Sequence, residues 1–182
     1  MSAASNAASN AGAAVAAIDR VVIGFGGNVG GEPAVIERFR RAREGLGAVG
    51  AVRAAPLYRT APLGPPQAAF LNTAVSLGAA DLRPDELLAT LHELEHLLGR
   101  DRSTESRWGP RTIDLDVLVW GSRVLRSPEL EVPHPRLAER RFALAPLAAL
   151  VGEGFEVPGA GALGPLLARV RTQDLEEIAA SW

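Results

Sequence analysis

The chain has 182 residues, of which 47% are hydrophobic and 22% charged, enough to bury one sizeable core in a single domain. Its formal net charge of −2 argues against a general nucleic-acid binder and against a polybasic membrane-binding protein. There is no cysteine, which excludes disulfides and thiol nucleophiles. All 19 basic residues are arginine, so the phosphate-binding lysine of a Walker A loop is also absent.

The predicted elements begin after an Ala-rich start. Residues 1–18 carry no charged side chain and lack the basic and strongly apolar stretches of a signal peptide. We expect them to form a disordered tail, followed by one domain over residues 19–182. The first half of that domain predicts a strand, a helix, a second strand, a proline-rich loop and a third strand. Their ranges are 20–25, 33–46, 48–58, 60–67 and 70–77.

The second half opens with the clearest helix, residues 81–98, which has leucines at helical spacing and a glycine directly after it. An arginine-rich loop (100–110), a fourth strand (111–120) and short helices at 142–150 and 163–170 follow. The order β-α-β-β-α-β is that of a ferredoxin-like α+β sandwich. We therefore expect a mainly antiparallel sheet of about four to six strands backed by helices. No run of roughly twenty apolar residues predicts a membrane span.

Two carboxylates stand two residues apart in the fourth strand. Because side chains alternate between the faces of a strand, Asp114 and Asp116 point to one face, which Leu118 and Trp120 should continue as apolar residues. Oxygen ligands in such a pair suit a hard cation, and like charges so close need a partner. We predict a magnesium site at the start of this strand. A solvated strand face with ordinary surface charges is the simpler alternative.

The loop before this strand supplies positive charge. Arg100, Arg102, Arg107 and Arg111 lie there, together with Trp108. Arginines that follow a triphosphate beside a carboxylate-held magnesium form a set for phosphoryl transfer. The loop has few apolar residues, which favours a mobile segment that closes over ligands. Taken alone it would be a solvated basic loop; beside the two aspartates it indicates a phosphate-binding site.

The third strand carries a ring and an amide on one face. Phe70 and Asn72 are two residues apart, so they suit stacking on a heterocycle and reading its edge. A stacked aromatic pair contributes about 0.5–1.5 kcal/mol beyond its buried area. A core phenylalanine beside a turn-forming asparagine explains this segment equally well.

Other motifs point to other functions. The helical segment His92–His96 satisfies H-E-x-x-H, the pattern of a zinc protease, for which Glu105 or Glu129 would be the third ligand. The segment Gly24–Gly30 resembles a dinucleotide-binding loop, but the glycine spacing fails at Val29. A non-catalytic ferredoxin-like module, such as a small-molecule sensor or an RNA-binding domain, is a further alternative; the net charge does not favour RNA.

A series of segments then occurs in one order along the chain: GFGGN (24–28), YRTAPLG (58–64), FLN (70–72), GRDR (99–102), RWGPRTIDLDVL (107–118), VPHPR (132–136) and RFALAPL (141–147). Together they closely resemble the 6-hydroxymethyl-7,8-dihydropterin pyrophosphokinases of folate biosynthesis over roughly residues 20–150, with WGPRTIDLD the most specific segment. Two positions depart from the family: Gly27 replaces the serine of a GSN motif, and Glu129 stands where some members have a basic residue.

The resemblance implies a kinase-type transferase that uses magnesium and moves the β,γ-pyrophosphoryl group of ATP to the pterin hydroxymethyl oxygen, leaving AMP. It implies catalytic roles for Arg100, Arg111, Asp114 and Asp116, with two Mg²⁺ ions held by the two aspartates. The implied pterin-binding residues are Thr60, Leu63, Phe70, Asn72 and Phe142. The implied ATP-binding residues are His92, Glu95, Arg100, Arg102, Trp108, Arg111, Val117, His134 and Arg140. We expect a cytoplasmic monomer whose partners are these two small substrates, with no nucleic acid and no membrane.

Overall fold

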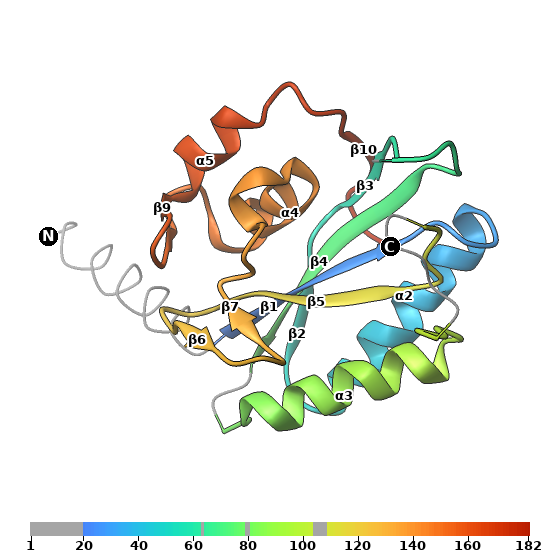
Figure 1. The fold of residues 1–182 in the computed structure, drawn as a ribbon, viewed down its shortest axis with the longest axis horizontal. Coiled ribbons are helices and arrows are strands. Elements are labelled where there is room, and N and C mark those ends of the chain that lie inside the picture. Colours follow the sequence, from blue (N-terminus) through green and yellow to red (C-terminus); the bar gives the residue numbers. More distant parts are fainter. Residues whose placement is uncertain (1–19, 63, 79–80, 104–108) are drawn as a thin grey trace, which may run out of the picture.

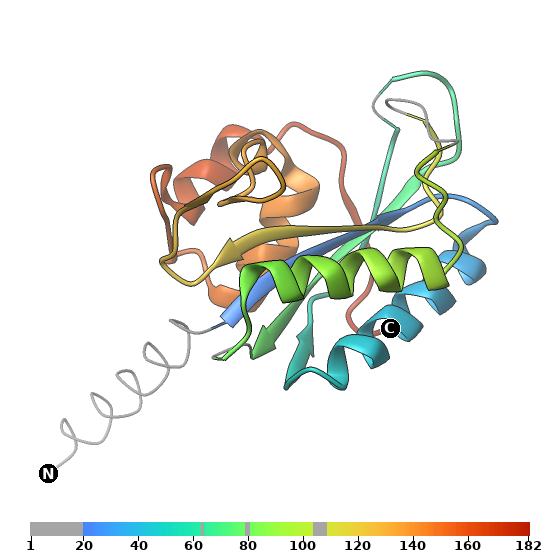
Figure 2. The ribbon, with the colours of Figure 1, turned by 60° about the horizontal axis from the view of Figure 1, so that its bottom comes forward.

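A computed structural model describes residues 20–62, 64–78, 81–103 and 109–182. Within these residues an antiparallel sheet is covered by helices on both faces (Figures 1 and 2). The sheet contains β1 (Arg20–Gly27), β2 (Val52–Ala54), β3 (Leu57–Thr60), β4 (Phe70–Gly78), β5 (Asp114–Trp120) and β10 (Glu176–Ala179). The helices are α2 (Glu32–Gly47), α3 (Pro84–Leu97), α4 (Arg141–Val151), α5 (Leu163–Arg169) and a 3₁₀ turn at Leu137–Glu139. Two small hairpins pair β6 (Leu125–Arg126) with β7 (Glu131–Val132) and β8 (Glu156–Val157) with β9 (Gly161–Ala162).

The strand order confirms the predicted ferredoxin-like topology. The strands run β10-β3-β4-β1-β5, with β2 also paired to β4, and every pairing is antiparallel. Helix α2 follows β1 and helix α3 precedes β5, as the β-α-β-β-α-β order requires. The predicted tail, residues 1–18, lies outside the described residues. Among the described residues, no helix combines the length and apolar character needed to cross a bilayer.

The single strand predicted over residues 48–58 is wrong, because the structure has two strands there. Both β2 and β3 pair with β4, and they are separated at Ala55 and Pro56. Proline has no N–H to donate to a strand ladder, so pairing stops at this position. The Thr73 hydroxyl lies 3.1 Å from the Ala55 carbonyl oxygen and 2.8 Å from that of Pro56, and it binds the backbone of this break.

Different helices bury the two faces of the sheet. Helices α2 and α3 pack on one face, whereas α4 and α5 cover one end of the other (Figure 2). Strand β4 is accordingly buried along almost its whole length. The predicted layer of two helices therefore accounts for one face of the sheet, and α4 and α5 form a second layer on the other face. The end of the second face that α4 leaves uncovered is where a ligand can reach the sheet.

Strand β5 begins at Asp114, three residues later than predicted, and contains a bulge. Val22 of β1 pairs with Val119 and Ile23 pairs with Val117, which leaves Leu118 without a partner in the register. An extra residue in one strand shifts the alternation of all that follow. The expectation that Trp120 continues the carboxylate face is thus wrong: Trp120 is fully buried in the core beneath α2 and α3.

The end of the described chain forms a C-terminal arm, residues 174–182, which includes the unpredicted strand β10. Trp182 reaches the core under the sheet, with ring centroids 6.1 Å from Phe25 and 5.9 Å from Phe39. Its indole N–H donates to the Ala55 carbonyl over 2.9 Å, and the Arg43 guanidinium stacks on its ring at 4.7 Å. The arm therefore supports β3 from the side and β1 from below.

Candidate active site

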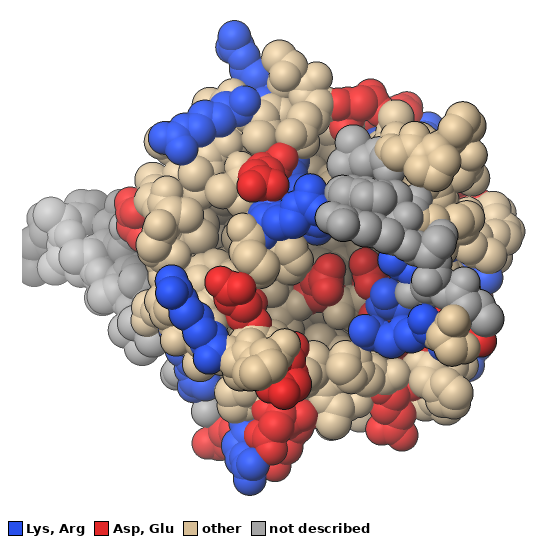
Figure 3. Space-filling view, viewed as in Figure 1, with Lys and Arg blue, Asp and Glu red and all other residues tan. Residues whose placement is uncertain are grey.

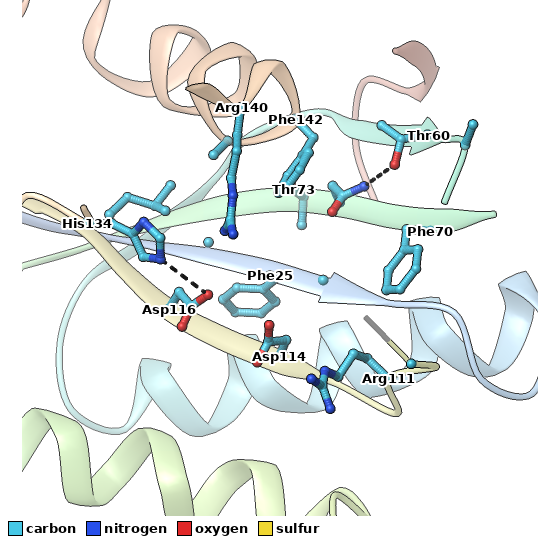
Figure 4. Close-up of a pocket in the computed structure, with 17 residues that line it drawn as sticks. Phe25, Thr60, Phe70, Thr73, Arg111, Asp114, Asp116, His134, Arg140 and Phe142 are labelled. Carbon is cyan, nitrogen blue, oxygen red and sulfur yellow. Dashed lines mark hydrogen bonds and ion pairs between the residues drawn. The ribbon is translucent and has the colours of Figure 1, made fainter. Parts of the chain in front are cut away.

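A pocket lies on the part of the sheet that α4 leaves open. Strands β1, β4 and β5 form its floor and the start of α4 closes one side (Figure 4). In the space-filling view, acidic side chains lie inside a hollow on this face and arginines stand at its margins (Figure 3). The residues that line the pocket are Gly24, Phe25, Gly26, Thr60, Ala61, Phe70, Asn72, Thr73, Gly109, Arg111, Asp114, Asp116, Leu118, His134, Arg140, Phe142 and Ala143.

Two carboxylates, Asp114 and Asp116, enter this pocket from the same face of β5, which agrees with the predicted alternation (Figure 4). Burial raises the pKa of Asp116 to about 6, and the negative charges of Asp114 and Glu95 act in the same direction. A cation between the two carboxylates would relieve this repulsion. Magnesium is commonly bound by one or two carboxylates together with substrate phosphates, so the pair fits that ion.

The H-E-x-x-H alternative finds no third ligand in the part of the chain that is described. No group of three or more His, Cys, Asp or Glu side chains there is placed to hold a metal ion. His92 and His96 are exposed on α3. One proposed third ligand, Glu105, lies outside the described residues.

A buried ion network stands beside the carboxylates. Glu95 is only 1% exposed, and its carboxylate accepts hydrogen bonds from Arg100, from Arg102 over 2.6 Å and from the backbone N–H of Leu115 over 2.8 Å. The same Arg100 guanidinium nitrogen that donates to Glu95 also donates to Asp114. Charges taken out of water are tolerated when they are paired and hydrogen-bonded in this way. Through this network α3 determines where Arg100 and Asp114 lie.

His134 faces the second carboxylate in a defined tautomer. Its Nδ1 accepts the backbone N–H of Arg136 over 3.1 Å, so the neutral ring carries its proton on Nε2, which lies 4.0 Å from an Asp116 oxygen. Burial lowers the pKa of His134 to about 4, and the positive charge of Arg140 acts in the same direction. At neutral pH the residue is therefore an uncharged N–H donor at the edge of the pocket.

This pKa predicts a pH-dependent effect of His134→Gln on stability. Between the folded pKa of about 4 and the usual value of 6.5, the unfolded chain binds more protons, so the wild type loses stability as the pH falls through this window. Glutamine does not titrate. In urea unfolding with a chelator, the variant should therefore gain about 1–2 kcal/mol relative to wild type at pH 5 compared with pH 8. His96→Gln on exposed α3 is the matched control. A difference that fails to grow toward acidic pH would contradict a buried, neutral His134.

The opposite end of the pocket is aromatic and amidic. The Asn72 Nδ2 donates to the Thr60 hydroxyl over 2.9 Å, which fixes the orientation of the amide (Figure 4). Phe70 lies on the same strand face as Asn72, and Phe142 descends from α4 on the other side of the pocket (Figure 4). The four side chains therefore line one pocket. Its chemistry suits a flat heterocycle with polar edges.

Asn28, which the sequence interpretation passed over, joins three loops behind this end of the pocket. Its Nδ2 donates to the Ala68 carbonyl over 2.9 Å and to the Gln67 side chain over 3.1 Å. Its Oδ1 accepts the Arg111 N–H over 2.8 Å, and its own N–H donates to the Arg111 carbonyl over 2.9 Å. The side chain is 5% exposed. The sequence feature that could have pointed to Asn28 was its place in the GFGGN segment.

The predicted site residues fall into two adjoining groups. Thr60, Phe70, Asn72, Phe142, Arg111, Asp114, Asp116, His134 and Arg140 line the pocket, whereas His92, Glu95, Arg100 and Arg102 line a neighbouring groove at the end of α3. Val117 is separate: its side chain is 4% exposed in the core beneath α2 and α3, which leaves only its backbone for a ligand contact. Leu63 and Trp108 lie outside the described residues.

The chain is similar to a known protein family and to several named relatives. A model of the 7,8-dihydro-6-hydroxymethylpterin-pyrophosphokinase (HPPK) family matches residues 22–152. A 2-amino-4-hydroxy-6-hydroxymethyldihydropteridine pyrophosphokinase of Bacillus subtilis is 41% identical over 127 residues, which cover 69% of this chain and 74% of the relative. The enzyme of that name from Pseudomonas aeruginosa is 37% identical over 88% of this chain and 98% of its own length. The one from Synechocystis is 40% identical over 70% of this chain and 64% of its own length.

Among solved structures, the fold resembles that of Plasmodium falciparum HPPK-DHPS, with a TM-score of 0.62 over 82% of this chain and 45% of that one. The sequence identity is 13%, so this likeness concerns the fold alone.

Proposed function

Because this chain belongs to the 7,8-dihydro-6-hydroxymethylpterin-pyrophosphokinase family, we propose that it transfers the pyrophosphoryl group of ATP to the hydroxymethyl oxygen of 6-hydroxymethyl-7,8-dihydropterin. The products are AMP and the pterin diphosphate, within folate biosynthesis. The observation that carries this proposal is one pocket with an amide and two rings at one end and two carboxylates at the other. We further propose that residues 19–182 are the single catalytic domain, acting as a cytoplasmic monomer.

The reaction requires alignment more than a nucleophilic side chain. The hydroxymethyl oxygen attacks the β-phosphorus, the bond from that phosphorus to the α,β-bridging oxygen breaks, and AMP leaves. Well-oriented reactants gain up to roughly 7–11 kcal/mol from such positioning. Asp114 and Asp116 would hold two Mg²⁺ ions, which neutralise phosphate charge and lower the pKa of the attacking hydroxyl. Asp116, on the pocket face of β5, is the proposed acceptor of the hydroxyl proton.

The pterin end of the pocket is proposed to recognise both the flat shape of the pterin ring and the hydrogen-bonding groups along its edge. Phe70 and Phe142 would stack on the two faces of the ring, as their positions on opposite sides of the pocket favour. Thr60 holds the Asn72 amide so that Oδ1 is available to accept N–H groups on the heterocycle edge. Leu63 is retained as a proposed pterin contact.

The phosphate end is proposed to use arginine in place of lysine. Arg100 and Arg111 would stabilise the developing charge on the transferred group, and their planar guanidinium groups suit phosphate oxygens. His134 offers its Nε2–H from the side of Asp116. The remaining proposed ATP contacts are His92, Arg102, Trp108, Val117 and Arg140.

An Asn28→Asp variant should weaken the pterin end selectively. Aspartate still accepts the Arg111 N–H, but its second oxygen would face the Ala68 carbonyl and the Gln67 amide oxygen, where the wild type donates. The loop between Thr60 and Phe70 would lose this attachment. We expect the KM for the pterin to rise about tenfold, near 1.4 kcal/mol, with the KM for ATP changed much less. Gln67→Ala, which removes one of the partners, is a graded control. Equal effects on both substrates would contradict this coupling.

Product analysis tests the proposed function. The purified chain is incubated with ATP, Mg²⁺ and 6-hydroxymethyl-7,8-dihydropterin, and the nucleotide products are separated. Formation of AMP with the pterin diphosphate is expected. ADP would indicate transfer of a single phosphoryl group, and the absence of both nucleotides would favour a ferredoxin-like binding module. Activity that survives removal of Mg²⁺ would contradict the assigned metal.

A further inference from the structure

Strand β1 presents two residues without side chains to the pocket. Gly24 and Gly26 alternate onto the same face and both line the floor. Gly26 pairs with Asn72 on β4 and with Asp114 on β5. It is therefore the strand position that separates the Asn72 amide, proposed to bind the heterocycle, from the Asp114 carboxylate, proposed to bind metal.

The surrounding protein explains the glycine at position 24 but not the one at 26. A Cβ at Gly24 would lie 3.0 Å from the Leu118 side chain, which packs against it. A Cβ at Gly26 would lie 3.6 Å from the Asn72 Oδ1 and 3.9 Å from the Asp114 Cβ, which are ordinary van der Waals distances. The backbone at Gly26 is extended in a paired strand, not left-handed. Neither packing nor backbone conformation requires glycine at this position.

Glycine inside a central strand weakens the strand unless something approaches the backbone closely. Above Gly26 the pocket is open between the Asn72 amide and the Asp114 carboxylate, so a ligand there can approach the backbone closely. In the proposed reaction the ring is held at the amide end, and the reacting oxygen must reach the carboxylate end. The one-carbon arm that joins them has to pass over the strand between these two positions.

We propose that Gly26 is a specificity-determining residue, because its missing side chain makes room for the hydroxymethyl arm of the acceptor between Asn72 and Asp114. This inference rests on the proposed function. It adds that Gly26 is the residue that lets the site accept a pterin carrying a hydroxymethyl group. A methyl group at residue 26 would occupy the path of the arm and leave the ring contacts intact.

The test compares Gly26→Ala with Gly78→Ala. Gly78 ends strand β4, and a Cβ there would also meet only ordinary contacts, 3.7 Å or more from Ala51. Binding of 6-hydroxymethyl-7,8-dihydropterin, of 7,8-dihydropterin without the arm, and of a non-hydrolysable ATP analogue with Mg²⁺ is measured by calorimetry. In Gly26→Ala the Kd for the hydroxymethyl compound should rise at least about tenfold. The Kd values for the armless pterin and for the nucleotide should stay within about twofold, and Gly78→Ala should resemble the wild type.

Equal weakening of both pterins, or no weakening in a variant whose melting curve shows a folded protein, would overturn the role of Gly26. A measurement on the wild type covers the case in which the variant does not fold. There 6-methyl-7,8-dihydropterin should bind no more weakly than the unsubstituted ring, and a tenfold loss would also overturn the proposal. If the wild type binds neither pterin and forms no AMP, the proposed function itself fails. If the wild type is active and pterin binding is unchanged in Gly26→Ala, the role of Gly26 is rejected and the proposed function stands.

Discussion

An Asp116→Asn variant is expected to lose at least about 1,000-fold of the pyrophosphoryl-transfer rate, equivalent to about 4 kcal/mol of transition-state stabilisation. Asparagine keeps the size of the side chain but removes the negative charge that would hold magnesium and the proposed acceptor of the hydroxyl proton. With Asp114 alone, the proposed magnesium site would have one carboxylate ligand in place of two. The rate is measured as AMP formation at saturating ATP and pterin.

The same variant should keep its fold, which separates a chemical defect from a structural one. In the metal-free wild type, burial and the neighbouring charges of Asp114 and Glu95 oppose ionisation of Asp116. Removing that charge should leave the melting temperature with a chelator unchanged or higher. Asp81→Asn, at an exposed position before α3, is the control for an Asp→Asn change. Wild-type turnover in Asp116→Asn, or loss of its folded state, would contradict the assignment.

The carboxylate pair and the aromatic end could be predicted because both depend on local rules. Alternation along a strand puts Asp114 and Asp116 on one face, as it does Phe70 and Asn72, whatever the rest of the chain does. The β-α-β-β-α-β order then brings the two strands to either side of β1. Local pattern and topology were sufficient for this much of the site.

The features that were missed depend on contacts between distant segments. The bulge at Leu118 adds one residue that no pattern in β5 announces, and it turns Trp120 to the other face. Strand β10 has only four residues, and it is a strand because it pairs with β3, which is far away in the sequence. The role of Asn28 likewise exists only when two other loops meet it. Interactions of this kind have no sequence period, so periodicity cannot reveal them.

Glu95 is the residue whose interpretation the structure changes most. Resemblance assigns it to ATP, but both of its carboxylate oxygens are occupied by protein donors, from Arg100, Arg102 and the Leu115 backbone, in a side chain 1% exposed. We infer that it acts as a positioning residue. It holds Arg100 where that side chain also meets Asp114, and so links α3 to the phosphate end of the pocket.

A Glu95→Gln variant should therefore lose both stability and rate. Glutamine leaves the guanidinium of Arg100, whose side chain is 7% exposed, with less negative charge around it, and breaking a buried pair costs about 3–5 kcal/mol. Urea unfolding should show that loss, whereas Glu139→Gln, which disrupts an exposed pair with Arg136, should change stability by less than about 1 kcal/mol. In the folded variant kcat should fall more than the KM for ATP rises, because the displaced groups act on the transferred phosphates. A raised KM for ATP with unchanged stability would instead make Glu95 a direct nucleotide ligand, since only a side chain free to leave its arginines could bind ATP without weakening the fold.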